Sequence, residues 1–166
     1  DRFYLQHYVL VLANCGCRIG EIRKLRWRDI QPIKIPTMEK EKKIEDGVSF
    51  EVSGKTGKRQ VIAQLSVAKY LNRLKRFREA ELGHLPPEDE YVFCRKDGSS
   101  VGSYRKGFEA FLKKYKLLTD IEGNRHTLYS LRHTYAVFRI SEEVNHYLLA
   151  TNMGTGVDML HKHYLK

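Results

Sequence analysis

The sequence predicts a mainly α-helical domain with one small antiparallel sheet, an α+β fold. Over most of the chain, apolar residues recur every three or four positions, which is the period of an amphipathic helix. One stretch instead carries β-branched residues on both sides of a glycine-containing turn, which is the pattern of a β-hairpin. The length of 166 residues lies within the usual range for one domain. We therefore expect a single domain over residues 1–166.

Helical patterns account for the beginning, the middle and the end of the chain. Residues 2–24 carry apolar side chains at helical spacing with a break at Gly16, so two helices are expected to meet there. A third pattern covers residues 66–82, and helical spacing returns at residues 104–118. Three short helices are predicted near the end, over residues 130–141, 144–152 and 157–166.

The predicted sheet is small. Residues 48–52 and 59–63 predict the two strands of the hairpin, and the lysine-rich residues between them predict its turn. Residues 31–47 contain two prolines and a run of charged residues, so they predict an irregular, solvated loop. The short apolar run Tyr91-Val92-Phe93 predicts one further strand.

The net charge of the chain indicates which class of partner it binds. Its 30 Lys and Arg against 20 Asp and Glu give a formal net charge of +10. A surplus of this size favours a polyanion, because cations that contact phosphates release condensed counterions. Nucleic acid is therefore the leading partner, and the alternative is a basic surface with no particular ligand. No apolar run approaches the roughly 20 residues that span a bilayer, which excludes a membrane-spanning protein.

The three cysteines predict neither a disulfide nor a metal site. Cys15 and Cys17 are separated by one residue, which is too close for an ordinary disulfide, so we expect a reducing compartment. Cys94 and the scattered histidines lack the spacing of zinc ligands. Buried thiols on an apolar face are the simpler interpretation.

Several cations fall at predicted turns or helix starts, where proteins commonly present groups to phosphates. They are Arg18, Lys55, Lys58, Arg59, Arg125 and Arg132. This placement adds to the evidence from net charge that the partner is a nucleic acid.

Four segments, in this order, resemble the tyrosine recombinases, or phage-type integrases. Residues 15–21 (Cys-Gly-Cys-Arg-Ile-Gly-Glu), followed by Leu-x-Trp-x-Asp, resemble the first motif of the family. Residues 53–59 resemble its lysine-bearing hairpin, and residues 129–136 (Tyr-Ser-Leu-Arg-His-Thr-Tyr-Ala) its second arginine motif. Residues 153–155 (Met-Gly-Thr) precede Tyr164 by the spacing of the last motif. Each string is weak alone, and the ordered set implies the tyrosine recombinase catalytic-domain fold.

The resemblance assigns a role to each candidate residue. Arg18 and Arg132 would hold the scissile phosphate, for which guanidinium groups offer permanently charged forks. Tyr164 would be the nucleophile that forms a 3′-phosphotyrosine, which conserves the ester bond energy, so that no ATP, metal or other cofactor is required. Lys55 would donate a proton to the leaving 5′-oxygen, with Lys58 as the alternative. The residues predicted to contact DNA are Lys58, Arg59, Arg125 and His133.

Two positions depart from the family pattern. Tyr129 stands where the family usually has an imidazole or an ammonium group, and Thr155 stands where it has His or Trp. Both are neutral hydroxyls that can donate hydrogen bonds, but a phenol with a pKa near ~10 is a poor base at neutral pH. His161, one helical turn before Tyr164, is a possible replacement base, and surface imidazoles are the alternative.

The resemblance also implies partners and context. The expected function is the catalytic domain of a site-specific integrase that acts on double-stranded DNA in the cytoplasm of a bacterial or phage-infected cell, associated with the nucleoid. The chain begins without Met in a helical pattern, so we expect a fragment that lacks an N-terminal core-binding domain and forms a homo-tetramer on DNA when full length. The alternatives are a non-catalytic DNA-binding module that kept the fold and a type IB topoisomerase-like enzyme.

Overall fold

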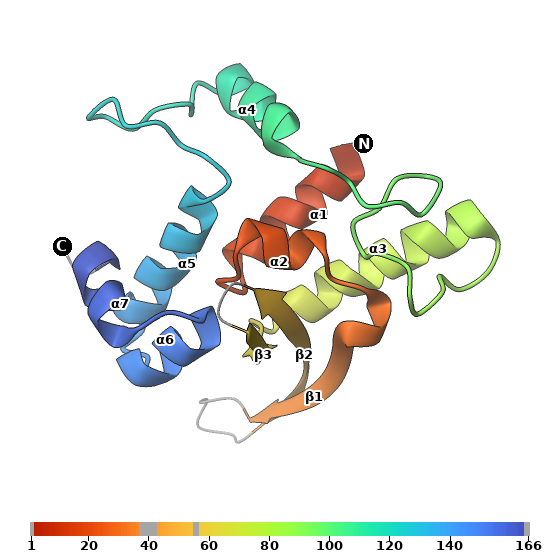
Figure 1. The fold of residues 1–166 in the computed structure, drawn as a ribbon, viewed down its shortest axis with the longest axis horizontal. Coiled ribbons are helices and arrows are strands. Elements are labelled where there is room, and N and C mark those ends of the chain that lie inside the picture. The colour runs from red at the N-terminus through yellow and green to blue at the C-terminus, as the bar shows by residue number, and fades with distance from the viewer. Residues whose placement is uncertain (1, 37–42, 55–56, 165–166) are drawn as a thin grey trace.

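The computed structural model describes residues 2–36, 43–54 and 57–164 (Figure 1). In these residues the chain forms helices around one small sheet, as the sequence predicts. The elements in chain order are α1 (Arg2–Ala13), α2 (Ile19–Arg23), a 3₁₀ turn (Trp27–Asp29), β1 (Ile30–Pro36), β2 (Ile44–Gly54), β3 (Gly57–Ile62), α3 (Ser66–Leu82), α4 (Arg105–Lys114), α5 (Ser130–Ser141), α6 (His146–Met153) and α7 (Val157–Tyr164).

The sheet is an antiparallel meander in the order β1-β2-β3. Phe50 at the centre of β2 is fully buried and pairs with Ile30 on one side and Val61 on the other. The predicted hairpin of β2 and β3 is confirmed, with Val52 opposite Arg59.

The predicted loop over residues 31–47 is wrong at both ends, because residues 31–36 belong to β1 and residues 44–47 to β2. Two prolines suggested a loop, but β1 is an edge strand, and an edge strand tolerates proline because one side of its backbone has no partner strand. Residues 39–42 of the charged run lie outside the described residues.

The predicted strand at residues 91–93 is also wrong. Tyr91 forms an isolated bridge with Arg26, and Cys94 forms another with Ser100. Val92 and Phe93 are buried in the main core, which explains their apolar character without a strand.

Helix α3 packs against β2 and against α1, and these elements share the main core. Tyr8 and Leu12 from α1 and Leu74 from α3 are almost fully buried there. The predicted break after α1 is confirmed at Gly16, which has a φ of +66°. A Cβ at Gly16 would lie 2.4 Å from the ring of Tyr135 in α5, so the turn after α1 packs directly against α5.

Helices α5, α6 and α7 form a second, smaller hydrophobic cluster and lie together on one side of the molecule (Figure 1). The predicted helices at the end of the chain are confirmed. Asn145 caps α6 by accepting hydrogen bonds from the backbone N–H groups of Tyr147 and Leu148. The helix ends at Gly154, whose φ of +65° is left-handed. None of the described helices is long and apolar enough to cross a membrane.

Candidate active site

Two arginines that are far apart in the sequence meet at the end of α6. Arg18, just before α2, donates from Nη2 to the carbonyl oxygen of Gly154 at 2.5 Å. Arg132, in the first turn of α5, donates from Nη1 to the carbonyl oxygens of Met153 at 2.8 Å and Gly16 at 2.6 Å. The two guanidinium groups therefore bind the carbonyls of successive residues, and the predicted pair lies at one place in the fold.

Arg132 is deeply buried, with 3% of its surface exposed. Its Nε is buried, and no acceptor in the described residues reaches it. A permanent cation with an unsatisfied N–H is costly to bury unless a ligand supplies the acceptor. The guanidinium of Arg132 is thus charged, fixed in position and only partly satisfied by the protein.

Glu21 organises the other side of the site. Its carboxylate accepts from the backbone N–H of Arg18 at 2.8 Å and from the guanidinium groups of Arg18 at 2.9 Å and Arg59 at 2.7 and 2.8 Å. Burial acts to raise the pKa of Glu21, but the hydrogen bonds from Arg59 and Arg18 outweigh it and lower that pKa. Glu21 therefore stays ionised and fixes both arginines.

Arg59 projects from β3 into this cluster. Its side chain is only 13% exposed, and its Nε donates to the carbonyl of Asn152 at 3.1 Å. A Cβ at Gly154 would lie 2.7 Å from its Cζ, so any larger residue there would force the Arg59 guanidinium to shift. Arg59 thus ties β3 to α2 and α6, and its predicted contact with DNA stays a prediction.

Tyr164, at the end of α7, is half-buried beside Arg132 and Tyr129. The pKa of the Tyr164 phenol lies above its ordinary value, and burial is the largest cause. A hydrogen bond with Arg132 lowers this pKa, and one with Tyr129 raises it. The Tyr164 ring also packs against His133, with ring centroids 4.7 Å apart. The predicted nucleophile and the predicted second arginine are therefore neighbours.

Thr155 and Lys55 complete the predicted catalytic set. Thr155 directly follows Gly154, is half-buried and donates its backbone N–H to the carbonyl of Ala150 at 2.9 Å. Thr155 is therefore the residue that follows the carbonyl to which Arg18 donates. Lys55 lies outside the described residues, so its predicted role as proton donor stays a prediction.

The remaining predicted DNA contacts have separate surroundings. Lys58 is exposed and pairs with Glu51 at 2.8 Å, and this carboxylate raises the pKa of the Lys58 ammonium. Arg125 pairs with Glu109 at 2.7 Å. Arg125 and His133 line the same open hollow beside α5.

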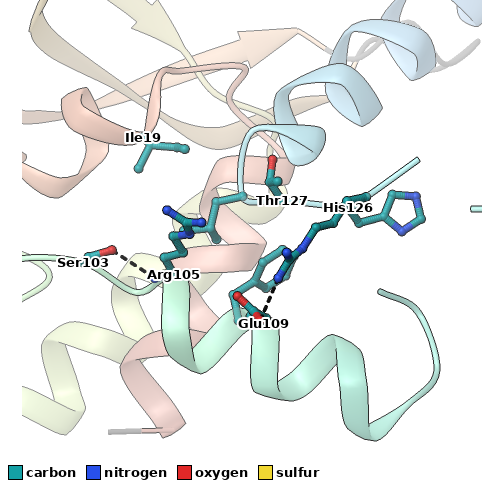
Figure 2. A pocket seen from close by; sticks show the side chains of 9 residues that line it. Ile19, Ser103, Arg105, Glu109, His126 and Thr127 are labelled. Atoms are coloured by element: carbon teal, nitrogen blue, oxygen red, sulfur yellow. Dashed lines mark hydrogen bonds and ion pairs between the residues drawn. The ribbon is translucent and has the colours of Figure 1, made fainter. Parts of the chain in front are cut away.

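Arg125 also lines a separate pocket of about 340 Å³ between α2, α4 and the segment before α5. Figure 2 shows Arg105 and Glu109 projecting from α4 toward the segment that carries His126 and Thr127. Ser103 and Ile19 close the opposite side.

His161 contacts a different partner from the one that its sequence position suggested. Its Nε2 lies 3.0 Å from Nδ1 of His146, so its ring faces α6. The histidine against the Tyr164 ring is His133 instead. Nothing in the sequence indicates this contact, because it depends on how α5 and α7 pack.

Comparisons with known proteins agree with this geometry. The model of the phage integrase family matches residues 1–164. Among solved structures, XerH site-specific recombinase bound to its difH substrate aligns with a TM-score of 0.71 and 17% identity over 98% of this chain and 43% of that one. The Tn1549 transposon integrase in complex with transposon right end DNA aligns with a TM-score of 0.66 and 21% identity over 99% of this chain and 55% of that one.

A lambda integrase dimer bound to a core site aligns with a TM-score of 0.69 and 15% identity over 98% of this chain and 52% of that one. The chain thus spans about half the length of these proteins. No curated protein sequence matches it. The fold, the converging arginines and the family match over almost the entire chain lead to one conclusion: the chain belongs to the phage integrase family of tyrosine recombinases.

Proposed function

We propose that this chain is the catalytic domain of a site-specific integrase that cleaves and rejoins duplex DNA through Tyr164. The observation that carries the proposal is the meeting of Arg18 and Arg132 at the end of α6, with the Tyr164 phenol beside Arg132. A binding module would have no need of a phenol at that position.

The two arginines would bind the scissile phosphate. Nε of Arg132 is buried without an acceptor in the described residues, so a phosphate would have to enter beside it to satisfy it, whereas the side chain of Arg18 is 32% exposed and open to a ligand. Charge that develops on the non-bridging oxygens during attack would be stabilised by these fixed cations. Removing one such donor typically lowers the rate about 10²- to 10³-fold.

Tyr164 would attack the phosphorus. A bond forms between its Oη and the phosphorus, the bond from phosphorus to the 5′-oxygen breaks, and the leaving oxygen takes a proton from Lys55. Rejoining reverses these steps, with the 5′-hydroxyl as nucleophile. Because the phosphodiester energy is kept in the phosphotyrosine, no nucleotide cofactor is needed.

Double-stranded DNA is the proposed partner. The formal net charge of +10 supports it, and XerH and the Tn1549 integrase have both been solved in complex with DNA. A homo-tetramer on DNA and a location with the nucleoid in the cytoplasm are part of the same proposal. The expected N-terminal core-binding domain would close around the DNA from the opposite side.

A pool of nicked duplexes with a randomised central sequence tests the proposal without knowledge of the target site. A nick just downstream of the cleavage site lets the short fragment that carries the new 5′-hydroxyl diffuse away, so the covalent complex accumulates. We expect a protein–DNA adduct that survives denaturing electrophoresis, and sequencing of the attached strand would reveal the site. Tyr164→Phe should abolish the adduct, whereas Tyr147→Phe, the same change at an exposed position on α6, should retain it.

Two outcomes would favour other functions. DNA binding without an adduct would indicate a non-catalytic module. An adduct together with relaxation of supercoiled plasmid, but without joining of two sites, would indicate a topoisomerase-like enzyme. An adduct that persists in Tyr164→Phe would contradict the assignment of the nucleophile.

A further inference from the structure

The proposed cleavage leaves one proton without an acceptor. The pKa of the Tyr164 phenol lies above its ordinary value, so the group is protonated at neutral pH and must lose a proton as it attacks. Tyr129 stands where the family usually carries an imidazole or an ammonium group and Thr155 where it carries His or Trp, and both are neutral hydroxyls. The inference below rests on the proposed function and concerns which residue takes that proton.

His133 lies beside both phenols of the site. Its ring centroid is 4.7 Å from that of Tyr164 and 5.3 Å from that of Tyr129. It is half-buried on α5, directly after Arg132, and one side lines the open hollow beside that helix. The imidazole is therefore in contact with the proposed nucleophile and next to the proposed phosphate ligand.

Five of the other six histidines have partners elsewhere, and the sixth, His163, lies farther from Tyr164 than His133 does, with ring centroids 6.4 Å apart. His7 is buried and bonded to Phe3, while His84 and His126 are bonded to backbone carbonyls. His146 and His161 bind each other. Within the part of the chain that the structure describes, no residue bonds to a ring nitrogen of His133, so both nitrogens are open to exchange protons.

The surroundings favour the neutral form of His133. Burial lowers its pKa most, and the nearby His163 and Arg132 lower it further. The titratable groups around His133 come from three places. Tyr129 and Arg132 lie at the start of α5, and His163 and Tyr164 lie on α7. Asp120, Arg125 and His126 line the hollow. An imidazole that is neutral at neutral pH can accept a proton.

We propose that His133 is the general base that accepts the phenolic proton of Tyr164 during strand cleavage. As the bond between Tyr164 Oη and phosphorus forms, the proton passes to a ring nitrogen of His133, and the leaving 5′-oxygen takes its proton from Lys55. In the rejoining step the imidazolium returns the proton to Tyr164 as the phosphotyrosine bond breaks. Hydrogen bonds of this kind are often long in unbound enzymes and shorten when substrate binds.

The test is the rate of adduct formation in a single turnover, measured on the nicked duplex that the wild-type protein selects, with this chain or any longer natural protein that contains it. His133→Phe retains a ring against Tyr164 but has no nitrogen, so packing is preserved and proton transfer is lost. We expect the rate to fall by about 10²-fold or more. His84→Phe, the same change at an exposed position after α3, is the matched control and should leave the rate unchanged.

The pH profile separates a base from a packing residue. For a base with a pKa lowered from its ordinary 6.5, the wild-type rate should fall only as the pH drops below that value. This acid limb should disappear in His133→Phe, and added imidazole should partly restore the rate of His133→Ala. A His133→Phe protein that keeps both the rate and the acid limb would overturn the inference.

One further measurement needs no variant at His133. NMR titration of the wild-type protein gives the pKa of the His133 ring directly. That pKa should coincide with the midpoint of the acid limb, and a clear mismatch would also overturn the inference. If the wild-type protein forms no adduct at all, the proposed function fails, which is a different result from an active protein that is indifferent to His133.

Discussion

Arg18 and Arg132 donate hydrogen bonds to the carbonyl oxygens of two successive residues, Gly154 and Met153, at the end of α6. The last carbonyls of a helix lack partners within the helix, and the helix dipole makes this end negative. Both features favour cations. The end of α6 therefore acts as a template that sets the positions of the two guanidinium groups.

Arg132→Lys should impair cleavage more than it impairs folding. A lysine keeps the charge but carries all its donors on one nitrogen, so it cannot hold the two carbonyls and also present a separate N–H where Nε of Arg132 lies. We expect adduct formation to slow by about 10²- to 10³-fold. The measurement is the single-turnover rate, with Arg73→Lys on the exposed surface of α3 as the control. Equal rates for the two variants would show that cleavage does not depend on the guanidinium group of Arg132.

Gly154→Ala should disturb the positions of Arg18 and Arg59 at once. The φ of +65° is unfavourable for alanine, and the added Cβ would meet the Arg59 guanidinium at 2.7 Å. We expect a loss of about 1–3 kcal/mol in the free energy of unfolding, measured with urea. Gly156→Ala is the matched control, because nothing lies within 4 Å of its Cβ, and it should change stability by less than about 0.5 kcal/mol.

Glu21→Gln should destabilise the fold, since it removes the negative charge between two arginines. The Glu21 side chain is 2% exposed and pairs with Arg59 at 2.7 Å. Breaking a buried ion pair on one side typically costs about 3 kcal/mol or more. Glu51→Gln removes an exposed pair with Lys58 and should cost less than about 1 kcal/mol. A similar cost for both variants would show that the Glu21 cluster adds no special stability.

The carboxylate of Glu21 should also make the free energy of unfolding depend on pH. The pKa of Glu21 in the folded protein lies below its ordinary 4.5, so its contribution is complete above pH 4.5 and is lost as the pH falls through the folded value. We expect the urea midpoint of the wild-type protein to drop as the pH falls below 4.5. The drop should be smaller in Glu21→Gln, which has no proton to take up at this position.

Much of this site could be predicted from local sequence. Arg18, Arg132 and Tyr164 each belong to a short motif, and the structure brings all three together. The partners of Glu21 could not be predicted in the same way, because Arg59 reaches it from a strand 38 residues further on. Arg59 was predicted to contact DNA because it is a cation near a hairpin tip, and only the packing of β3 against α2 and α6 reveals its bonds to protein.

The errors in the fold have a similar origin. Pro32 and Pro36 are local signals for a loop, whereas the edge position that tolerates them is a property of the complete sheet. In the same way, the sequence separation of His161 from Tyr164 suggested a shared helix face. The structure instead turns His161 toward α6 and leaves His133, from another helix, against the phenol.

The pair of His146 and His161 should hold α7, and with it Tyr164, against α6. Their ring nitrogens are 3.0 Å apart and form a side-chain hydrogen bond between these helices. Loss of a hydrogen bond of about 1 kcal/mol should speed local opening about fivefold. His146→Ala should therefore accelerate amide hydrogen exchange in α7, while Lys162→Ala, at an exposed position on α7, should not.

The double variant of His146 and His161 should exchange no faster than either single variant, because both remove the same bond. Additive effects would mean that the two rings stabilise α7 independently.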